Sequence, residues 1–318
     1  MQEVRGSIPL SSTSSALFFP AFPAAMNAGR PSPAPRAIVA YSWAAASAVA
    51  FAGMSFCAHV ASAHAHWTMT GAVRCLVGAI VAYGVARARG AATRVHDRRG
   101  IWLRSIAGTS AMLFTFYALG TPLPLGDAVT LFNLTPIFLA LLGPVLLRER
   151  AGRRVWIAVP LCMAGLVLIV RPEIVVGAGA LSGAVAAVGS ALSSTFAYAL
   201  LRRMGNESPE AVALHFSLFA AAVLSALALL HIGAPPAATV GWMLGAGVMG
   251  GFAQLALTRA YAMERAARVA PIGYLNVVVS ALLGALALHE LPSARAVAGM
   301  ALIVSGGLVV TLAGKVAR

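Results

Sequence analysis

Residues 211–258 contain no Asp, Glu, Lys or Arg, and residues 105–147 contain a single charged residue, Asp127. The whole chain is 60% hydrophobic and only 10% charged. Such a composition cannot surround one soluble core without leaving a largely apolar surface. A membrane span needs about 20 apolar residues, so each of the two stretches is long enough for more than one span. The sequence therefore predicts an integral membrane protein.

We predict an all-α membrane domain of ten transmembrane helices. Proline-containing segments at 121–126 and 231–236 divide the two long apolar stretches, because proline cannot continue a helix. The expected spans are 37–58, 67–86, 101–120, 125–147, 154–171, 177–201, 210–232, 238–262, 267–289 and 294–314.

Basic residues gather in every second predicted connection. They occur near the chain start, at 87–99, 148–154, 202–203 and 265–268, and at the chain end, whereas 59–66, 121–126 and 231–238 have none. Because basic loops stay on the cytoplasmic side, both termini are expected in the cytoplasm. The net charge of +14 then reflects the orientation of the loops in the membrane. It does not indicate nucleic-acid binding, and we expect no nucleic-acid partner. Arginine far outnumbers lysine, and alanine and glycine are abundant. This composition favours a bacterial inner membrane as the location of the protein.

The chain contains an internal duplication. Residues 140–169 align without gaps on residues 281–310 after a shift of 141, with identities that include Leu142/Leu283, Gly143/Gly284, Leu147/Leu288 and Glu149/Glu290. A unit of five spans has an odd number of crossings, so its second copy enters the membrane upside down. The sequence thus predicts two inverted five-helix repeats, 37–171 and 177–314. Residues 1–36 are expected to be a flexible leader, with Met26 as an alternative start, and 315–318 a cytoplasmic tail.

Neither catalytic nor metal-binding motifs are found. The chain has no HExxH, GxSxG or P-loop pattern, and its cysteines and first-loop histidines lack the spacing or partners of a metal site: Cys57, Cys75, Cys162, His59, His64 and His66. We therefore expect no enzyme activity, cofactor or metal. An intramembrane enzyme acting on lipid-linked substrates, or a non-transporting membrane scaffold or sensor, are the alternatives.

The third and fourth predicted helices resemble a known family. The run Phe116-Tyr-Ala-Leu-Gly-Thr-Pro-Leu-Pro-Leu-Gly-Asp-Ala128, with Leu134-Thr-Pro136 and Leu147-Arg-Glu149, is similar to the drug/metabolite transporter superfamily, EamA type. The second half repeats the pattern in Ala260-Tyr-Ala262, Ala270-Pro271 and Leu288-His-Glu290. The resemblance covers about residues 37–314. The chain departs from symmetry at Val277, which stands where the first half has Pro136.

The resemblance implies that helices 1–4 and 6–9 surround a central cavity, with helices 5 and 10 peripheral. It implies transport of small metabolites or drugs by alternating access, and we expect an exporter or an exchanger. Members of the superfamily carry amino acids, nucleotide-like metabolites, vitamins and drugs, so the resemblance names no single substrate. The expected partners are a small-molecule substrate and the lipid bilayer, and a homodimer is one option that the sequence leaves open.

Candidate site residues are the polar or kink-forming groups within the spans, because such groups are costly in hydrocarbon and usually face a cavity. Arg74 lies about 10 Å along the second helix, where it is placed to meet an anionic substrate, an acidic side chain or a backbone carbonyl. The other cavity candidates are Tyr117, Asn133, Pro136, His215, Gln254, Tyr261, Tyr274 and Asn276. Packing or interfacial anchoring is the alternative for these residues. For Asp127, Glu149 and Glu290 we expect capping or pairing with arginine.

Overall fold

The computed structural model describes residues 34–146, 155–170, 178–204, 207–231, 233, 235–263 and 269–313. Every regular element in these ranges is a helix, which confirms the all-α prediction. The elements are α1 (Ala34–Ser62), α2 (Trp67–Arg89), α3 (Arg98–Leu119), α4 (Leu125–Phe132), α5 (Thr135–Leu146), α6 (Val155–Val170), α7 (Ala178–Arg203), α8 (Pro209–Ala228), α9 (Ala237–Met263), the 3₁₀ helix η1 (Ala270–Tyr274), α11 (Leu275–Ala287) and α12 (Ala294–Ala313). The first helix begins within the predicted leader; residues 1–33 and 314–318 lie outside the described ranges.

The helices have the length and surface of membrane spans. Five are long and apolar enough to cross a bilayer alone, in α1, α2, α7, α8 and α9, and four shorter apolar segments lie in the remaining parts of the chain. Large apolar side chains such as Ile80, Val185 and Leu286 are exposed on the outside of the bundle. An apolar exterior of this kind suits lipid and not water. The chain is a multi-pass membrane protein.

The 141-residue register extends beyond the segment in which the sequence reveals it. Adding 141 to the bounds of α2 gives 208–230, and α8 is Pro209–Ala228; adding it to the bounds of α3 gives 239–260, and α9 is Ala237–Met263. Each half crosses the membrane five times, so the second half starts from the opposite side. The predicted fold of two inverted five-helix repeats is confirmed.

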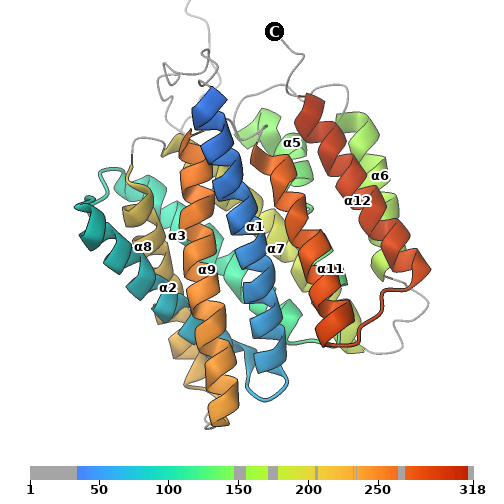
Figure 1. Ribbon diagram of the computed structural model, residues 1–318, viewed down its shortest axis with the longest axis horizontal. Coiled ribbons are helices and arrows are strands. Elements are labelled where there is room, and N and C mark those ends of the chain that lie inside the picture. Colours follow the sequence, from blue (N-terminus) through green and yellow to red (C-terminus); the bar gives the residue numbers. More distant parts are fainter. Residues whose placement is uncertain are drawn as a thin grey trace, which may run out of the picture. The chain divides into compact units, whose positions relative to one another are not determined.

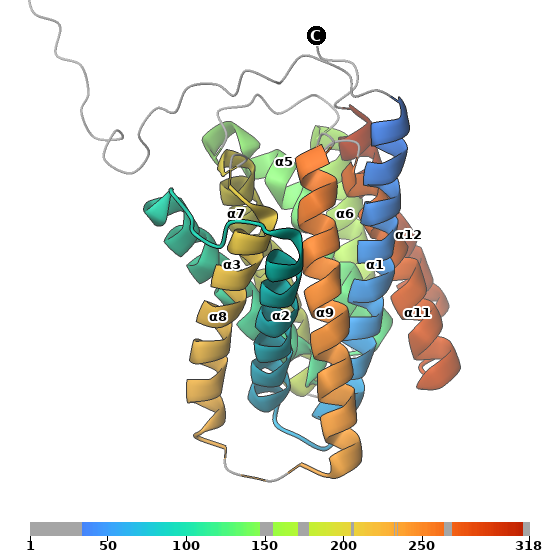
Figure 2. The same cartoon turned by 60° about the vertical axis from the view of Figure 1, so that its left-hand side comes forward.

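The two halves pack against each other in symmetry-related pairs. Helix α1 packs on α9, and their counterparts α7 and α3 pack on each other in the same way. Helices α2 and α8 are counterparts that pack on one another, as are α6 and α12. Figure 1 shows α6 and α12 side by side at one edge of the bundle, and Figure 2 shows α2 between α8 and α9. Residues from both halves therefore meet in the interior.

The fourth predicted span is interrupted near its middle. Helix α4 ends at Phe132, and α5 begins at Thr135 with Pro136 as its second residue. Proline lacks the N–H that a continuous helix needs, and local side chains bind carbonyls on the α4 side. The Asn133 Nδ2 donates to the Val129 carbonyl at 2.8 Å, and the Thr135 hydroxyl donates to the Phe132 carbonyl at 2.9 Å. The structure thus divides a helix that we had drawn as one.

The ninth predicted span changes helix type at the equivalent position. The 3₁₀ helix η1 contains Pro271 and ends at Tyr274, and α11 begins at Leu275. Subtracting 141 from 274 and 275 gives 133 and 134, the two residues between α4 and α5. The two halves therefore depart from a regular α-helix at the same register position, by a break between α4 and α5 and by a change from 3₁₀ to α-helix between η1 and α11, although Val277 and not proline is the counterpart of Pro136.

Candidate functional site

Arg74 is completely buried inside the bundle. Its Nη2 donates to the Gly250 carbonyl of α9 at 3.4 Å, and its Nη1 makes a long contact of 3.8 Å with the Cys75 sulfur. Its Nε has no hydrogen-bond partner among the described residues. Of the three partners that the sequence suggests, the structure provides the backbone carbonyl, at a distance near the limit for a hydrogen bond.

A second arginine, Arg104 of α3, is 2% exposed and was missed by the sequence analysis. Its guanidinium carbon lies 4.1 Å from the centroid of the buried Phe216 ring, and that of Arg74 lies 6.0 Å from the same centroid. The two cations are therefore at most about 10 Å apart, on a ring that attracts positive charge. The Nε and Nη1 of Arg104 have no partner within the described ranges.

Glycines make the space for both arginines. A Cβ on Gly250 would lie 2.7 Å from the Arg74 Nε and 2.8 Å from the Met54 sulfur. A Cβ on Gly108, one turn after Arg104, would lie 2.9 Å from the Arg104 Nη1 and 2.8 Å from the Phe216 ring. An arginine followed one turn later by glycine is the sequence signal that would have drawn attention to Arg104.

Four other predicted cavity residues lie at or near the helix interruptions, whereas Gln254 lies within α9. Tyr274 is 4% exposed, and neither its hydroxyl nor the Gln254 Nε2 has a partner in the described part of the chain. Asn133 lies at the interruption of the first half, and Asn276 accepts a hydrogen bond from the Ser280 hydroxyl at 3.3 Å. Pro136 is the second residue of α5. These positions combine interrupted backbone with buried polar groups.

Tyr117, Tyr261 and His215 are each in contact with another polar or aromatic side chain. The Tyr117 hydroxyl donates to the Ser182 hydroxyl at 3.1 Å, and the Tyr261 and Tyr198 ring centroids are 6.3 Å apart. His215 shares a 3.0 Å hydrogen bond with the Ser105 hydroxyl. Residue 215 is the register counterpart of Arg74, because 74 plus 141 is 215. The second half thus carries an imidazole at the position where the first half carries a guanidinium.

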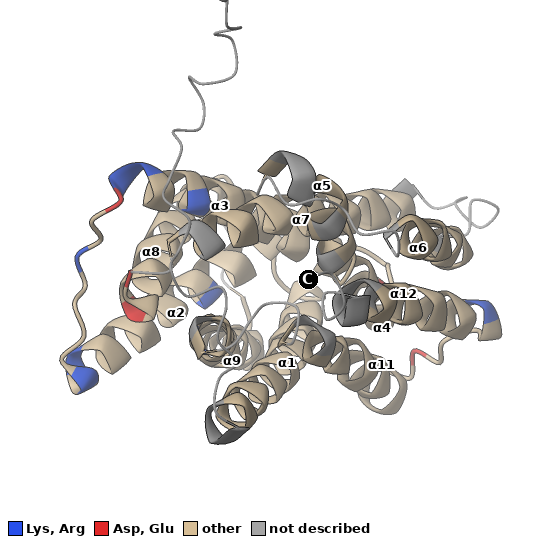
Figure 3. Ribbon diagram, turned by 90° about the horizontal axis from the view of Figure 1, so that it is seen from above, with Lys and Arg blue, Asp and Glu red and all other residues tan. Residues whose placement is uncertain are grey.

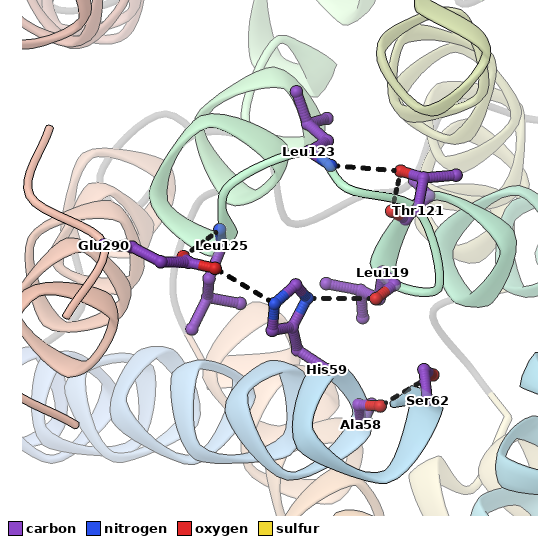
Figure 4. Close-up of polar contacts among 9 residues, drawn as sticks. Ala58, His59, Ser62, Leu119, Thr121, Leu123, Leu125 and Glu290 are labelled. Carbon is purple, nitrogen blue, oxygen red and sulfur yellow. Dashed lines mark hydrogen bonds and ion pairs between the residues drawn. The ribbon is translucent and has the colours of Figure 1, made fainter. Parts of the chain in front are cut away.

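At one end of the bundle, Glu290 connects the two halves (Figure 4). Its Oε1 lies 3.2 Å from the His59 Nε2, and its Oε2 accepts at 2.8 Å from the N–H of Leu125, the first residue of α4. The other ring nitrogen of His59 faces the Leu119 carbonyl at 3.0 Å. Glu290 therefore caps a helix of the other repeat, and its charged partner is a histidine where we expect an arginine.

The environment of Glu290 favours its ionised form. Burial acts to raise the pKa of the carboxyl, but the hydrogen bonds with His59 and the Leu125 N–H outweigh burial, and the net pKa lies below the ordinary value. A negative charge at the first turn of α4 also suits the partial positive charge of a helix N-terminus. Asp127 lies in that same first turn, whereas Glu149 is outside the described residues.

At the opposite end, acidic residues bind the basic connection between α2 and α3. Glu210 accepts from the Arg259 Nη2 at 3.0 Å and lies 4.0 Å from the Arg89 Nε. Glu207 accepts at 2.9 Å from the backbone N–H groups of both His96 and Asp97. Figure 3 shows Lys and Arg gathered along this connection. Contacts between the two halves therefore occur at both ends of the bundle.

Comparison with known proteins gives a consistent assignment. The model of the EamA-like transporter family matches residues 38–171 and 181–312. The chain is 30% identical over 236 residues to the pseudopaline exporter CntI of Pseudomonas aeruginosa, covering 73% of this chain and 81% of the exporter. It is 27% identical over 205 residues to a riboflavin transporter of Vibrio cholerae, covering 64% of this chain and 67% of that protein.

A protein of known crystal structure shares the fold. It superimposes with a TM-score of 0.67 at 21% identity and covers 87% of this chain and 97% of its own. Two family matches, one in each half, agree with the duplicated architecture. The matched family and these two named relatives are transporters and not enzymes, as the sequence predicts. The chain is a membrane transporter that belongs to the EamA-like transporter family.

Proposed function

We propose that the protein moves a small organic solute across the membrane by alternating access, with the solute bound midway between the two ends. The observation that carries this proposal is the interruption of α4/α5 and of η1/α11 at equivalent register positions. Irregular backbone within a membrane is tolerated where it is buried in protein or lines a solute pathway, and paired interruptions in inverted repeats are typical of transporter binding sites.

A buried polar group at the junction of η1 and α11 supports the same location. The Tyr274 hydroxyl is buried without a partner among the described residues. Leaving such a group unpaired costs about 1–3 kcal/mol. A solute that binds there would provide the missing hydrogen bond, so the cost would be offset in the loaded state.

The contacts at the two ends suggest how access would alternate. His59 and Glu290 join the halves at one end, where the rings of His66 and His231 also stack with centroids 3.6 Å apart. Glu207 joins the halves at the other end through the backbone at His96 and Asp97. In a rocking transporter, one set of contacts opens while the other stays closed.

The direction of transport and the membrane in which the protein lies complete the proposal. The end with the α2–α3 connection carries Arg87, Arg89, Arg94, Arg98 and Arg99, so it faces the cytoplasm by the positive-inside rule. The exporter CntI supports export or exchange across a bacterial inner membrane as the physiological direction.

A cross-link between the halves tests alternating access. In the His66→Cys/His231→Cys double variant, a short thiol cross-linker with a reducible disulfide would join the N-cap position of α2 to the segment after α8. Bacteria that express the wild type are expected to show a changed profile of extracellular metabolites relative to cells with an empty vector. Inverted or right-side-out vesicles of the double variant should lose flux of the changed metabolite on cross-linking and recover it on reduction.

The two single-cysteine variants are the controls, because one thiol cannot bridge the halves, and the native cysteines Cys57, Cys75 and Cys162 are buried. Full flux through the cross-linked double variant would contradict a rocking mechanism. An unchanged metabolite profile in expressing cells, together with no flux in vesicles, would contradict transport itself.

A further inference from the structure

We propose that Arg74 and Arg104 form the recognition site for an anionic solute that carries a carboxylate or phosphate group. The inference rests on the proposed function, because it takes the bound anion to be the solute that is transported. It adds a contact on α2, α3 and α8, for the charged group of that solute, to those proposed at the α4/α5 and η1/α11 positions. The two guanidinium groups come from neighbouring helices α2 and α3 and share the ring of Phe216 on α8. No other pair of buried arginine side chains occurs among the described residues.

The energetics of burial call for a negative partner. Removing an ionised arginine from water costs several kcal/mol, and two guanidinium groups within about 10 Å of each other also repel. The protein offsets this only in part, through the Gly250 carbonyl and the face of Phe216. The Nε of Arg74 and the Nε and Nη1 of Arg104 keep unused hydrogen-bonding capacity.

Three glutamates of the described residues are engaged elsewhere. Glu290 binds His59, Glu210 binds Arg259, and Glu207 binds the backbone at His96 and Asp97. None of the ion pairs in the described part of the chain includes Arg74 or Arg104. An internal salt bridge, the alternative for Arg74, is therefore absent among the described residues, and we take the solute to supply the compensating charge.

The surroundings suit an oxyanion. The guanidinium fork donates two parallel hydrogen bonds to a carboxylate or a phosphate. The hydroxyl of Thr70, one turn before Arg74, is buried and has no partner among the described residues. Gly108 and Gly250 keep side-chain atoms away from the guanidinium groups.

The position of each arginine fits access from either side. Arg74 is the eighth residue of α2, about 10 Å from its Trp67 end, and Arg104 is the seventh residue of α3, about 9 Å from its Arg98 end. The two helices run in opposite directions, so one cation lies toward each end of the bundle. A solute between them would contact one arginine from whichever side is open and both when enclosed.

The experiment measures the melting temperature of the full-length protein in detergent at constant ionic strength. A panel of carboxylate- and phosphate-bearing metabolites is titrated, led by citrate and glycerol 3-phosphate, with glycerol as the uncharged control. We expect at least one anion to raise the melting temperature with saturation, and glycerol to leave it unchanged. The carboxylate and phosphate arms then identify which group is recognised.

Arginine variants connect that rise to the site. In Arg74→Met and Arg104→Met, the half-saturating anion concentration should increase at least tenfold, whereas Arg99→Gln, an exposed arginine of the same α3, should behave as wild type. Without anions, Arg104→Met should melt no lower than wild type, because it removes an under-paired buried charge. The proposal is wrong if no anion of the panel stabilises the wild type, or if stabilisation is equal in all four proteins.

Counterflow in liposomes separates this proposal from the transport proposal. Radiolabelled citrate or glycerol 3-phosphate is used, according to which one binds. Anion binding that depends on Arg74 and Arg104 without any flux would overturn the transport function and leave the anion site intact. Flux of an uncharged or cationic solute that both methionine variants retain would overturn the anion site and leave transport intact.

Discussion

The second helices of the two repeats, α2 and α8, occupy equivalent places and pack on one another, yet the two carry different chemistry. Arg74 of α2 and His215 of α8 are separated by the register of 141, and α2 and α8 pack on one another. Arg74 is fully buried against Gly250, whereas His215 is partly buried and bonded to Ser105. The position equivalent to Arg104 is Gly245. The backbone is therefore nearly symmetric, while the buried positive charge belongs to the first half.

This difference shows that the two repeats share their helix packing and differ in their buried charge. The proposed rocking requires two halves that pack alike, and the paired contacts of α1 with α9 and of α7 with α3 fit that requirement. The proposed anion site needs only one set of binding groups, and the first half supplies it. Each of the following experiments compares a position with its counterpart or with a matched position.

Exchanging the two equivalent residues should have the largest effect. In the Arg74→His/His215→Arg double variant, the total number of each residue type is conserved. We expect anion binding to weaken at least tenfold, because the space beside Gly250 is adapted to the guanidinium group. The measurement is the anion titration by melting temperature. Retention of wild-type affinity in the exchanged protein would show that the two positions are interchangeable.

A side chain at Gly250 should destabilise the protein next most strongly. Gly250→Val places a Cβ against the Arg74 Nε and Met54 sulfur, and we expect a loss of about 1–3 kcal/mol through overpacking. Gly241→Val is the matched control, because Gly241 is on the same α9 and no heavy atom lies within 4 Å of its Cβ position. Thermal or denaturant unfolding in detergent measures the stability of both variants. An equal loss of stability in Gly250→Val and Gly241→Val would contradict a close fit around Arg74.

Truncation of the counterparts Asn133 and Tyr274 should affect the free energy of unfolding differently: it should fall for Asn133 and stay unchanged or rise for Tyr274. Asn133→Ala removes the bond to the Val129 carbonyl and should cost about 1 kcal/mol. Tyr274→Phe removes a buried hydroxyl without a described partner, so stability should be unchanged or rise by up to about 1 kcal/mol. Unfolding measurements on both variants determine whether the free energy of unfolding falls or rises in each. A loss in Tyr274→Phe as large as that in Asn133→Ala would mean that the hydroxyl is bound.

The smallest effect should be a pH dependence from Glu290. Its pKa in the folded protein is lowered from 4.5, so ionisation stabilises the fold above the unfolded pKa and this stability is lost as pH falls through the folded pKa. Glu290→Gln should cost about 1 kcal/mol at neutral pH, the difference between a charged and a neutral hydrogen bond. Below pH 4 the variant and wild type should converge.

Melting temperatures from pH 7 down to about pH 3, which passes below the lowered pKa of Glu290, measure this convergence. Glu207→Gln provides the comparison at the opposite end of the bundle, because burial acts to raise the pKa of Glu207 but hydrogen bonds from the backbone at Asp97 and His96 lower it overall. A constant difference between Glu290→Gln and wild type across the pH range would exclude the charge of Glu290 as the cause.

Most of the helical architecture was predictable from local sequence, because span length and proline position act within one segment. The interruption at Asn133 and Pro136 was anticipated only as a kink, and the 3₁₀ helix before Leu275 was not anticipated at all. Arg104 was missed because the expected span 101–120 placed it close to the cytoplasmic end. Helix α3 instead begins at Arg98, which moves Arg104 almost one turn deeper into the bundle.

The sequence by itself determined that the chain spans a membrane, that it is a duplicated five-helix unit and that the copies are inverted. Those properties follow from apolar run length, identities at one fixed spacing and the distribution of arginine, all of which are local or additive along the chain. Only the tertiary structure decided that Arg74 and Arg104 meet on Phe216 and that Glu290 caps α4. The rotation of each helix about its axis and the neighbour it faces depend on packing between segments more than 100 residues apart in the chain.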